Sequence, residues 1–162
     1  MDAVESWHDF NVAIVGAAAA LAGLVIVAAS VNIGDIVKET SLTSRLASGI
    51  SGLVLALTAS AIGLMPAISD VAYGVSVLIV AAGFLAFPVQ AARRIVENRH
   101  PENRARFFKV VLGLVAPLAY LIGGVMLAVG MPGGLLLFAI GSILSIVAAL
   151  MISWVVLVEV LR

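Results

Sequence analysis

The chain has 162 residues, of which 63% are hydrophobic and 11% charged, with nine basic and nine acidic side chains. Soluble domains are about 45–50% apolar and about 25% charged, so a soluble fold of this length could not bury so much apolar surface. The mean hydropathy of +1.22 therefore indicates a membrane protein. The absence of cysteine excludes disulfides, zinc–thiolate sites and cysteine nucleophiles.

Spanning a bilayer takes about 20 apolar residues, and lipid forces the backbone to satisfy its own hydrogen bonds. Strand-like alternation of polarity is missing from runs such as residues 17–22, so the spans are predicted to be helices. The fold class is an all-α, polytopic transmembrane bundle that occupies residues 1–162 as a single domain. Its five helices are predicted at about residues 11–33, 46–68, 71–92, 107–130 and 133–161. The start of the chain has no basic run, so the first segment is expected to remain as a span.

The first segment is preceded by the stretch Trp7-His8-Asp9-Phe10. Aromatic side chains gather where membrane helices meet water, so we interpret Trp7 and Phe10 as interface anchors. Adjacent helical residues diverge by roughly 100°, so His8 and Asp9 are poorly placed to chelate one ion. No metal site is predicted here, because no second histidine follows at ligand spacing.

Three acidic residues surround the same stretch. In a helix, Asp2, Glu5 and Asp9 share one face at three- and four-residue spacing. They are predicted to form an acidic rim that attracts cations at the mouth of the first helix.

Small residues recur at four-residue spacing along the first segment. Such pairs let helix backbones approach closely in a bilayer. We therefore expect the first helix to pack at the centre of the bundle or against a second subunit, through Gly16, Ala20 and Gly23.

The second segment carries hydroxyl side chains along one helical face, among them Ser48, Ser51 and Thr58. Two readings stay open for this stripe. It would line a narrow pore, or it would hold neighbouring helices together by hydrogen bonds.

The basic residues all fall on one side of the predicted bundle. Lys38 and Arg45 lie between the first two helices, six lie in residues 93–109, and Arg162 follows the last helix. The other side carries Asp2, Glu5, Asp9 and Asp70 and no basic residue. Because cytoplasmic loops carry the excess of Lys and Arg, the N-terminus is predicted outside and the C-terminus inside.

The segment 93–109 is predicted to be a basic cytoplasmic loop. It is interpreted as a determinant of topology that also contacts anionic lipid headgroups. Nucleic acid is not an expected partner of one short membrane-bound loop. The basic residues concerned are Arg93, Arg94, Arg99, Arg104, Arg106 and Lys109.

No acidic or basic residue is expected at mid-depth, which disfavours an ion-coupled carrier. Motifs for acyl-transfer nucleophiles and for phosphate-binding loops are also missing from the sequence. The chain is therefore predicted not to be an enzyme and to need no cofactor.

The first fifth of the sequence carries a resemblance. Trp7-His8-Asp9-Phe10, the run from Gly16 to Leu24 and Ser30-Val31-Asn32-Ile33 resemble a group of small, uncharacterised bacterial membrane proteins that are frequent in actinobacteria. The resemblance covers the first helix and its approaches. It implies a small multi-pass protein of the bacterial inner membrane, and some of these similar proteins are labelled as modulators of a membrane-bound protease.

Three functions remain as hypotheses. The first is a non-enzymatic integral membrane protein that acts by helix–helix association, either as a homo-oligomer or as an accessory subunit of another membrane protein. The second is a homo-oligomeric, cation-selective channel lined by the first or the second helix. The third is a protein that binds anionic lipid or modulates a membrane protease.

Overall fold

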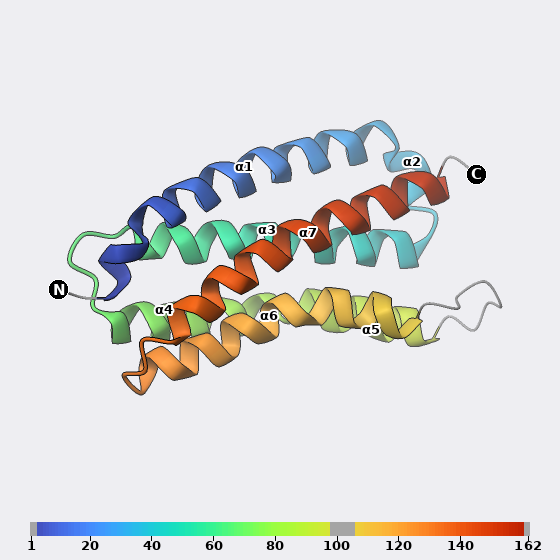
Figure 1. Cartoon of the computed structure of the whole chain (residues 1–162). Helices are drawn as coiled ribbons and strands as arrows, with labels where there is room; N and C mark the ends of the chain where they lie inside the picture. The colour runs from blue at the N-terminus through green and yellow to red at the C-terminus, as the bar shows by residue number, and fades with distance from the viewer. Residues whose placement is uncertain (1–2, 98–105, 161–162) are drawn as a thin grey trace.

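The computed structural model of the chain describes residues 3–97 and 106–160, and every regular element in these ranges is helical (Figure 1). Five helices, with α4 and α5 counted as one, are long and apolar enough to cross a membrane. The predicted all-α bundle with five spans is confirmed. The elements are η1 (Ala3–Trp7), α1 (His8–Val31), α2 (Ile33–Ile36), α3 (Thr40–Gly63), α4 (Asp70–Phe84), α5 (Ala86–Glu97), α6 (Arg106–Ala128) and α7 (Gly134–Val160).

The two ends of the bundle differ in charge. One end, called the acidic end below, holds η1 and the turns before α4 and α7, with Glu5, Asp9 and Asp70 (Figure 1). The other, called the basic end, holds α2 and the ends of α5 and α7 (Figure 1). All basic side chains that the structure describes lie at the basic end, namely Lys38, Arg45, Arg93 and Arg94. This separation matches the predicted sidedness, while the orientation in the membrane stays a prediction.

Helix α3 is the central helix of the bundle. It packs against α1, α7 and the α4–α5 pair. In its most apolar stretch 50% of the residues are buried, against 22% in α1. Helix α1 lies at the edge, along α3 and only slightly against α7 (Figure 1). Of the two placements expected for the first helix, the central one is therefore wrong, and contact with a second subunit stays a prediction.

The helices extend beyond the apolar runs that predicted them. Helix α1 begins at His8, and α3 begins at Thr40, six residues before the expected start. Polar residues continue these helices because elongating an existing helix adds one hydrogen bond per residue without a new nucleation cost. The same effect narrows the predicted loop 93–109, since α5 continues to Glu97 and α6 begins at Arg106. At its other end α3 stops at Gly63, five residues before the expected end.

The third span is interrupted at Leu85, between α4 and α5. Pro88 has no N–H to donate to the Phe84 carbonyl one turn earlier, and its ring crowds that carbonyl. The flanking hydrogen bonds remain, from Leu85 N to Ala81 O at 3.0 Å and from Val89 N to Leu85 O at 3.2 Å. Proline therefore breaks this span locally, whereas Pro117 lies inside the continuous helix α6.

Two adjacent glycines of α6 allow close contact with two neighbouring helices. A Cβ added at Gly124 would lie 3.1 Å from the Gly74 carbonyl oxygen in α4. A Cβ added at Gly123 would lie 2.8 Å from the Gly134 carbonyl oxygen at the start of α7. Helices α6 and α7 are thus joined tightly near the acidic end, and they diverge toward the basic end (Figure 1).

The N-terminal segment is held against the bundle by Asp70, the first residue of α4. Its carboxylate oxygens accept hydrogen bonds from the backbone N–H groups of Ala3 at 3.0 Å and Val4 at 2.9 Å. The Val4 side chain is 2% exposed and packs in the main hydrophobic cluster. The same turn is capped by Ser69, whose hydroxyl accepts a bond from Ala72 N at 3.3 Å.

Candidate functional site

Polar side chains collect in the interior of the bundle, while its outer surface is rich in exposed aliphatic residues. Burying a polar group is costly unless it finds a partner, so such side chains mark sites of specific packing or binding. They surround three hollows that follow one another from the acidic to the basic end. The buried polar residues of the described chain are Asn11, Arg45, Ser48, Ser51, Ser60, Ser142 and Ser145.

The hollow nearest the acidic end measures about 10 Å³ and lies beside Asn11, Tyr73 and Tyr120. The Tyr120 hydroxyl and Ser142 Oγ are 2.7 Å apart. Ser142 donates to the Phe138 carbonyl at 2.9 Å, so its oxygen accepts the proton of Tyr120. This bond joins α6 to α7 inside the bundle.

Replacing Tyr120 with phenylalanine should lower the free energy of unfolding by about 1 kcal/mol, since one interhelical hydrogen bond in a membrane protein is worth roughly 0.6–1.7 kcal/mol. The loss stays small because Ser142 keeps its bond to Phe138. Thermal or denaturant unfolding in detergent measures it. The control is the same substitution at Tyr73, whose ring packs edge-on against Phe138. A loss above roughly 3 kcal/mol, the range of a cavity in a core, would contradict this account of Tyr120.

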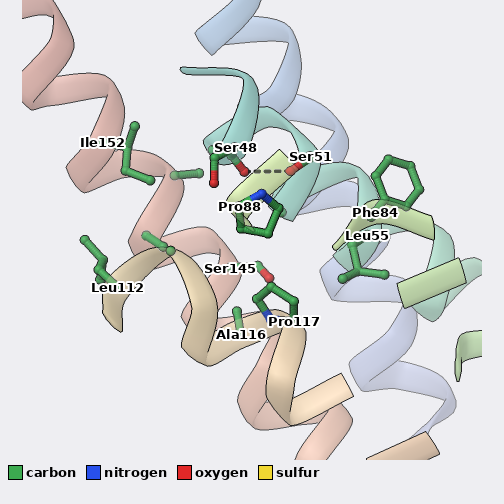
Figure 2. A pocket seen from close by; sticks show the side chains of 15 residues that line it. Ser48, Ser51, Leu55, Phe84, Pro88, Leu112, Ala116, Pro117, Ser145 and Ile152 are labelled. Carbon is green, nitrogen blue, oxygen red and sulfur yellow. Dashed lines mark hydrogen bonds between the residues drawn. The ribbon is translucent and has the colours of Figure 1, made fainter. Parts of the chain in front are cut away.

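The middle hollow, of about 20 Å³, lies among α3, α5, α6 and α7 (Figure 2). Ser51 Oγ donates to the Ser48 carbonyl at 2.8 Å, whereas Ser145 Oγ is buried without a hydrogen-bond partner. Pro88 and Pro117 both face this hollow, and each leaves the carbonyl four residues earlier without its helical donor. A polar space of this size has room for one water molecule.

The third hollow is a cleft of about 220 Å³ at the basic end, called the basic-end cleft below. It opens where α6 and α7 diverge, and its polar wall is formed by Arg45 and Ser48 of α3. The Arg45 side chain is 7% exposed and already takes part in interactions within the protein. Phe108 and Met151, which are exposed, also line the cleft. Five residues line both the cleft and the middle hollow, namely Ser48, Pro88, Leu112, Gly113 and Ile152.

The predicted hydroxyl stripe of α3 divides in the structure. Ser48 and Ser51 are buried and point into the middle hollow (Figure 2). Thr58 is half-buried and donates to the carbonyls of Val54 at 2.8 Å and Leu55 at 3.1 Å in its own helix. The serines therefore face the inside of a single chain.

The two predicted interface anchors are both half-buried and touch each other. The rings of Trp7 and Phe10 are 5.7 Å apart and perpendicular. Trp7 packs against the main hydrophobic cluster, and Phe10 packs against the cluster of Ile14, Ala18 and Ala56. Both aromatic rings lie at the acidic end, and both also pack against the hydrophobic core of the bundle.

The predicted acidic rim is only partly described. Asp2 lies outside the described residues, and Glu5 and Asp9 are exposed. Because Ala3–Trp7 forms a 3₁₀ turn, the α-helical spacing that placed Glu5 and Asp9 on one face does not hold across it. His8 Nδ1 lies 3.3 Å from Asp9 Oδ1 on the surface. Within residues 3–97 and 106–160 no group of three or more potential metal ligands is found.

Gly16, Ala20 and Gly23 lie on the exposed face of α1. A Cβ added at Gly16 or Gly23 would meet no atom of another described helix within 4 Å. The small-residue face predicted to contact another helix is therefore turned away from the other helices that the structure describes.

Of the predicted basic loop, Arg93 and Arg94 lie exposed on α5. Arg99 and Arg104 lie outside the described residues. Arg106 and Lys109 lie in α6, and their side chains are outside the described part of the structure.

Arg45, predicted to lie between the first two helices, belongs to α3 and lines the basic-end cleft, which was not predicted. A signal was present, because Arg45 precedes Ser48 by three residues and Gly52 by seven, which places all three on one helical face. The helical face that carries the hydroxyl stripe thus also carries the guanidinium of Arg45, toward the start of α3. The other walls of the cleft come from three further helices, which no local spacing reveals.

Comparison with known proteins adds no relative. Neither protein-family models, nor curated proteins, nor solved structures give a match to this chain.

Proposed function

We propose that this multi-pass membrane protein is a non-enzymatic component of the bacterial inner membrane that acts by association of helices. The observation that carries the proposal is the bare face of α1 formed by Gly16, Ala20 and Gly23. In a bilayer, such a face lets a second helix approach closely and gain packing contacts that lipid chains do not match. The partner is a second copy of the chain or another membrane protein that the chain serves as an accessory subunit.

The use of the same pattern elsewhere in the chain supports this reading. Gly124 packs against Gly74 of α4, and a Cβ added at Gly141 would lie 3.0 Å from the ring of Tyr120. These glycines are covered by neighbouring helices of the same chain. The face of α1 has the same spacing, but among the described residues no other helix packs against Gly16 or Gly23.

Isoleucine in place of Gly16 or Gly23 should weaken the association. A bulky side chain in a close helix contact costs about 1–3 kcal/mol, which raises the dissociation constant about 5- to 150-fold. Native mass spectrometry from nanodiscs would report both the oligomeric state and any other protein that remains bound.

The matched control is Gly83→Ile, because Gly83 in α4 is equally open but lies on a different helix. It should leave the association unchanged. A wild-type protein that is monomeric and has no bound partner would contradict the proposal. A co-purifying protein lost only from the α1 variants would favour the accessory subunit over the homo-oligomer.

A cation channel has less support. Ser48 and Ser51 face the interior of one chain, so a pore between subunits would have to be lined by α1. That face is apolar, and the nearest acidic residues that the structure describes, Glu5 and Asp9, lie at the acidic end of the bundle. Binding of anionic lipid is favoured by a separate observation, the basic-end cleft.

A further inference from the structure

We propose that the basic-end cleft binds an anionic phospholipid of the surrounding leaflet. One acyl chain enters between α6 and α7, and the phosphate contacts the guanidinium of Arg45. This site is independent of the face of α1 and does not require the chain to associate.

The size of the cleft suits one hydrocarbon chain. Its volume of about 220 Å³ exceeds that of an engineered apolar cavity of about 150 Å³ that binds benzene. It is below the roughly 300 Å³ at which pockets for whole drug-sized ligands begin. Part of one acyl chain therefore fits, while the rest of that chain, the second chain and the glycerol remain in the bilayer.

The walls are apolar and built largely from small or flexible side chains. Ala91 and Ala92 of α5 leave the space that larger residues would fill. Met151 adapts its shape to an irregular ligand because it has three rotatable bonds and no branch. Leu112, Ile152 and Val155 complete the hydrocarbon surface.

Arg45 lies at the depth at which phospholipid phosphates are found. It follows the first residue of α3 by five positions, about 7.5 Å along the axis. The polar layer of a bilayer is roughly 5–7 Å thick on each side of its hydrocarbon core. The guanidinium therefore sits near the boundary between headgroups and acyl chains.

The chemistry of Arg45 matches a phosphate. A guanidinium presents five N–H donors in a planar fork that binds phosphate oxygens in pairs. Arg45 already has a partner within the protein, and a guanidinium with five donors can serve more than one acceptor. Ser48, one turn further along the same wall, supplies a hydroxyl. Basic pockets between membrane helices are a recurrent form of headgroup site.

The route of entry favours a membrane lipid over a ligand from water. Helices α6 and α7 are closely joined at the acidic end and diverge at the basic end (Figure 1). The exposed side chains of Phe108 and Met151 line the cleft, so its opening faces the lipid. Arg93 and Arg94 are exposed on α5, the helix that supplies the alanine wall, and they add positive charge at this end.

The test compares phosphatidylglycerol with phosphatidylcholine of identical chains, titrated onto the delipidated protein and followed by native mass spectrometry. The wild type should bind one phosphatidylglycerol at least tenfold more tightly than phosphatidylcholine. Arg45→Gln should reduce this preference to less than about threefold. Ala92→Phe, which keeps Arg45 and fills the cleft, should remove the tightly bound lipid altogether.

Lys38→Gln is the matched control, because it removes one positive charge at the same end of the bundle. A hydrogen bond from Lys38 to Asp35 raises the pKa of Lys38, so this lysine is charged at neutral pH. The control should keep the wild-type preference. Each variant is first checked by thermal unfolding without lipid, and Ala92→Phe decides the matter if Arg45→Gln does not fold. Equal binding by the wild type and Ala92→Phe would overturn the proposal. An equal loss of the preference in Lys38→Gln would overturn it as well. In a separate titration with oleate, a fatty acid without phosphate, binding as tight as that of phosphatidylglycerol would also overturn it.

Discussion

Replacing Gly74 with alanine should lower the free energy of unfolding by about 3 kcal/mol, which is the upper part of the range for overpacked cores. The added Cβ would lie 2.5 Å from Leu127 Cβ, 3.0 Å from the Ala128 backbone nitrogen and 3.1 Å from the Gly124 carbonyl oxygen. Two of these three atoms belong to the α6 backbone, so a change of side-chain rotamer cannot relieve the contact. Helices α4 and α6 would have to move apart. Denaturant unfolding in mixed micelles measures the loss.

The same substitution at Gly83 provides the control within the same helix. Apart from its chain neighbours and its own helix backbone, no atom of the described residues lies within 4 Å of a Cβ added there. Because alanine favours a helix over glycine by about 0.5–1 kcal/mol, Gly83→Ala should leave the stability unchanged or raise it slightly. The two variants should therefore differ in the sign of their effect. Equal effects would show that α4 and α6 do not approach as closely as the structure indicates.

Removal of the Asp70 carboxylate should release the N-terminal segment. A hydrogen bond to a charged group is worth about 1.5–3 kcal/mol, and Asp70 accepts two of them, from Ala3 and Val4. Allowing for partial exposure, Asp70→Ala should cost about 3 kcal/mol of docking free energy, which is roughly a hundredfold in the open population. Since the chain has no cysteine, a single cysteine at Val4 reports the docking by its rate of labelling.

In the parent protein this cysteine should be protected, because Val4 is 2% exposed. The Asp70→Ala change should accelerate its labelling by one to two orders of magnitude. Asp9→Ala is the control, since its carboxylate is fully exposed and contacts only the side chain of the adjacent His8 among the interactions described. A labelling rate that does not respond to Asp70→Ala would mean that η1 is held by packing alone.

The number of spans and the separation of charge could be predicted because each depends on a local property of the sequence. An uninterrupted apolar run of about 20 residues can cross lipid only in a structure that satisfies its own backbone hydrogen bonds, which favours a helix. The break at Leu85 follows in the same way from Pro88. Helix ends were less predictable, since Thr40 to Arg45 are polar and yet helical.

Which helices pack against one another could not be predicted from local spacing. Gly16 and Ala20 on α1 have the same spacing as Gly124 and Ala128 on α6, but the first pair is exposed and the second contacts α4. Which pair is covered depends on how five helices share one interior. The cleft was missed for a similar reason, because it exists only where α6 and α7 diverge over α3 and α5.

The contact between Asp70 and the N-terminal segment sets an order of events during synthesis. Val4 leaves the ribosome before its partner Asp70, which follows 66 positions later. The segment therefore waits at the membrane surface while α1 and α3 insert, and it docks only when α4 arrives. A nascent chain that stalls after α3 would still expose η1. The state of η1 thus reports whether α4 is in place.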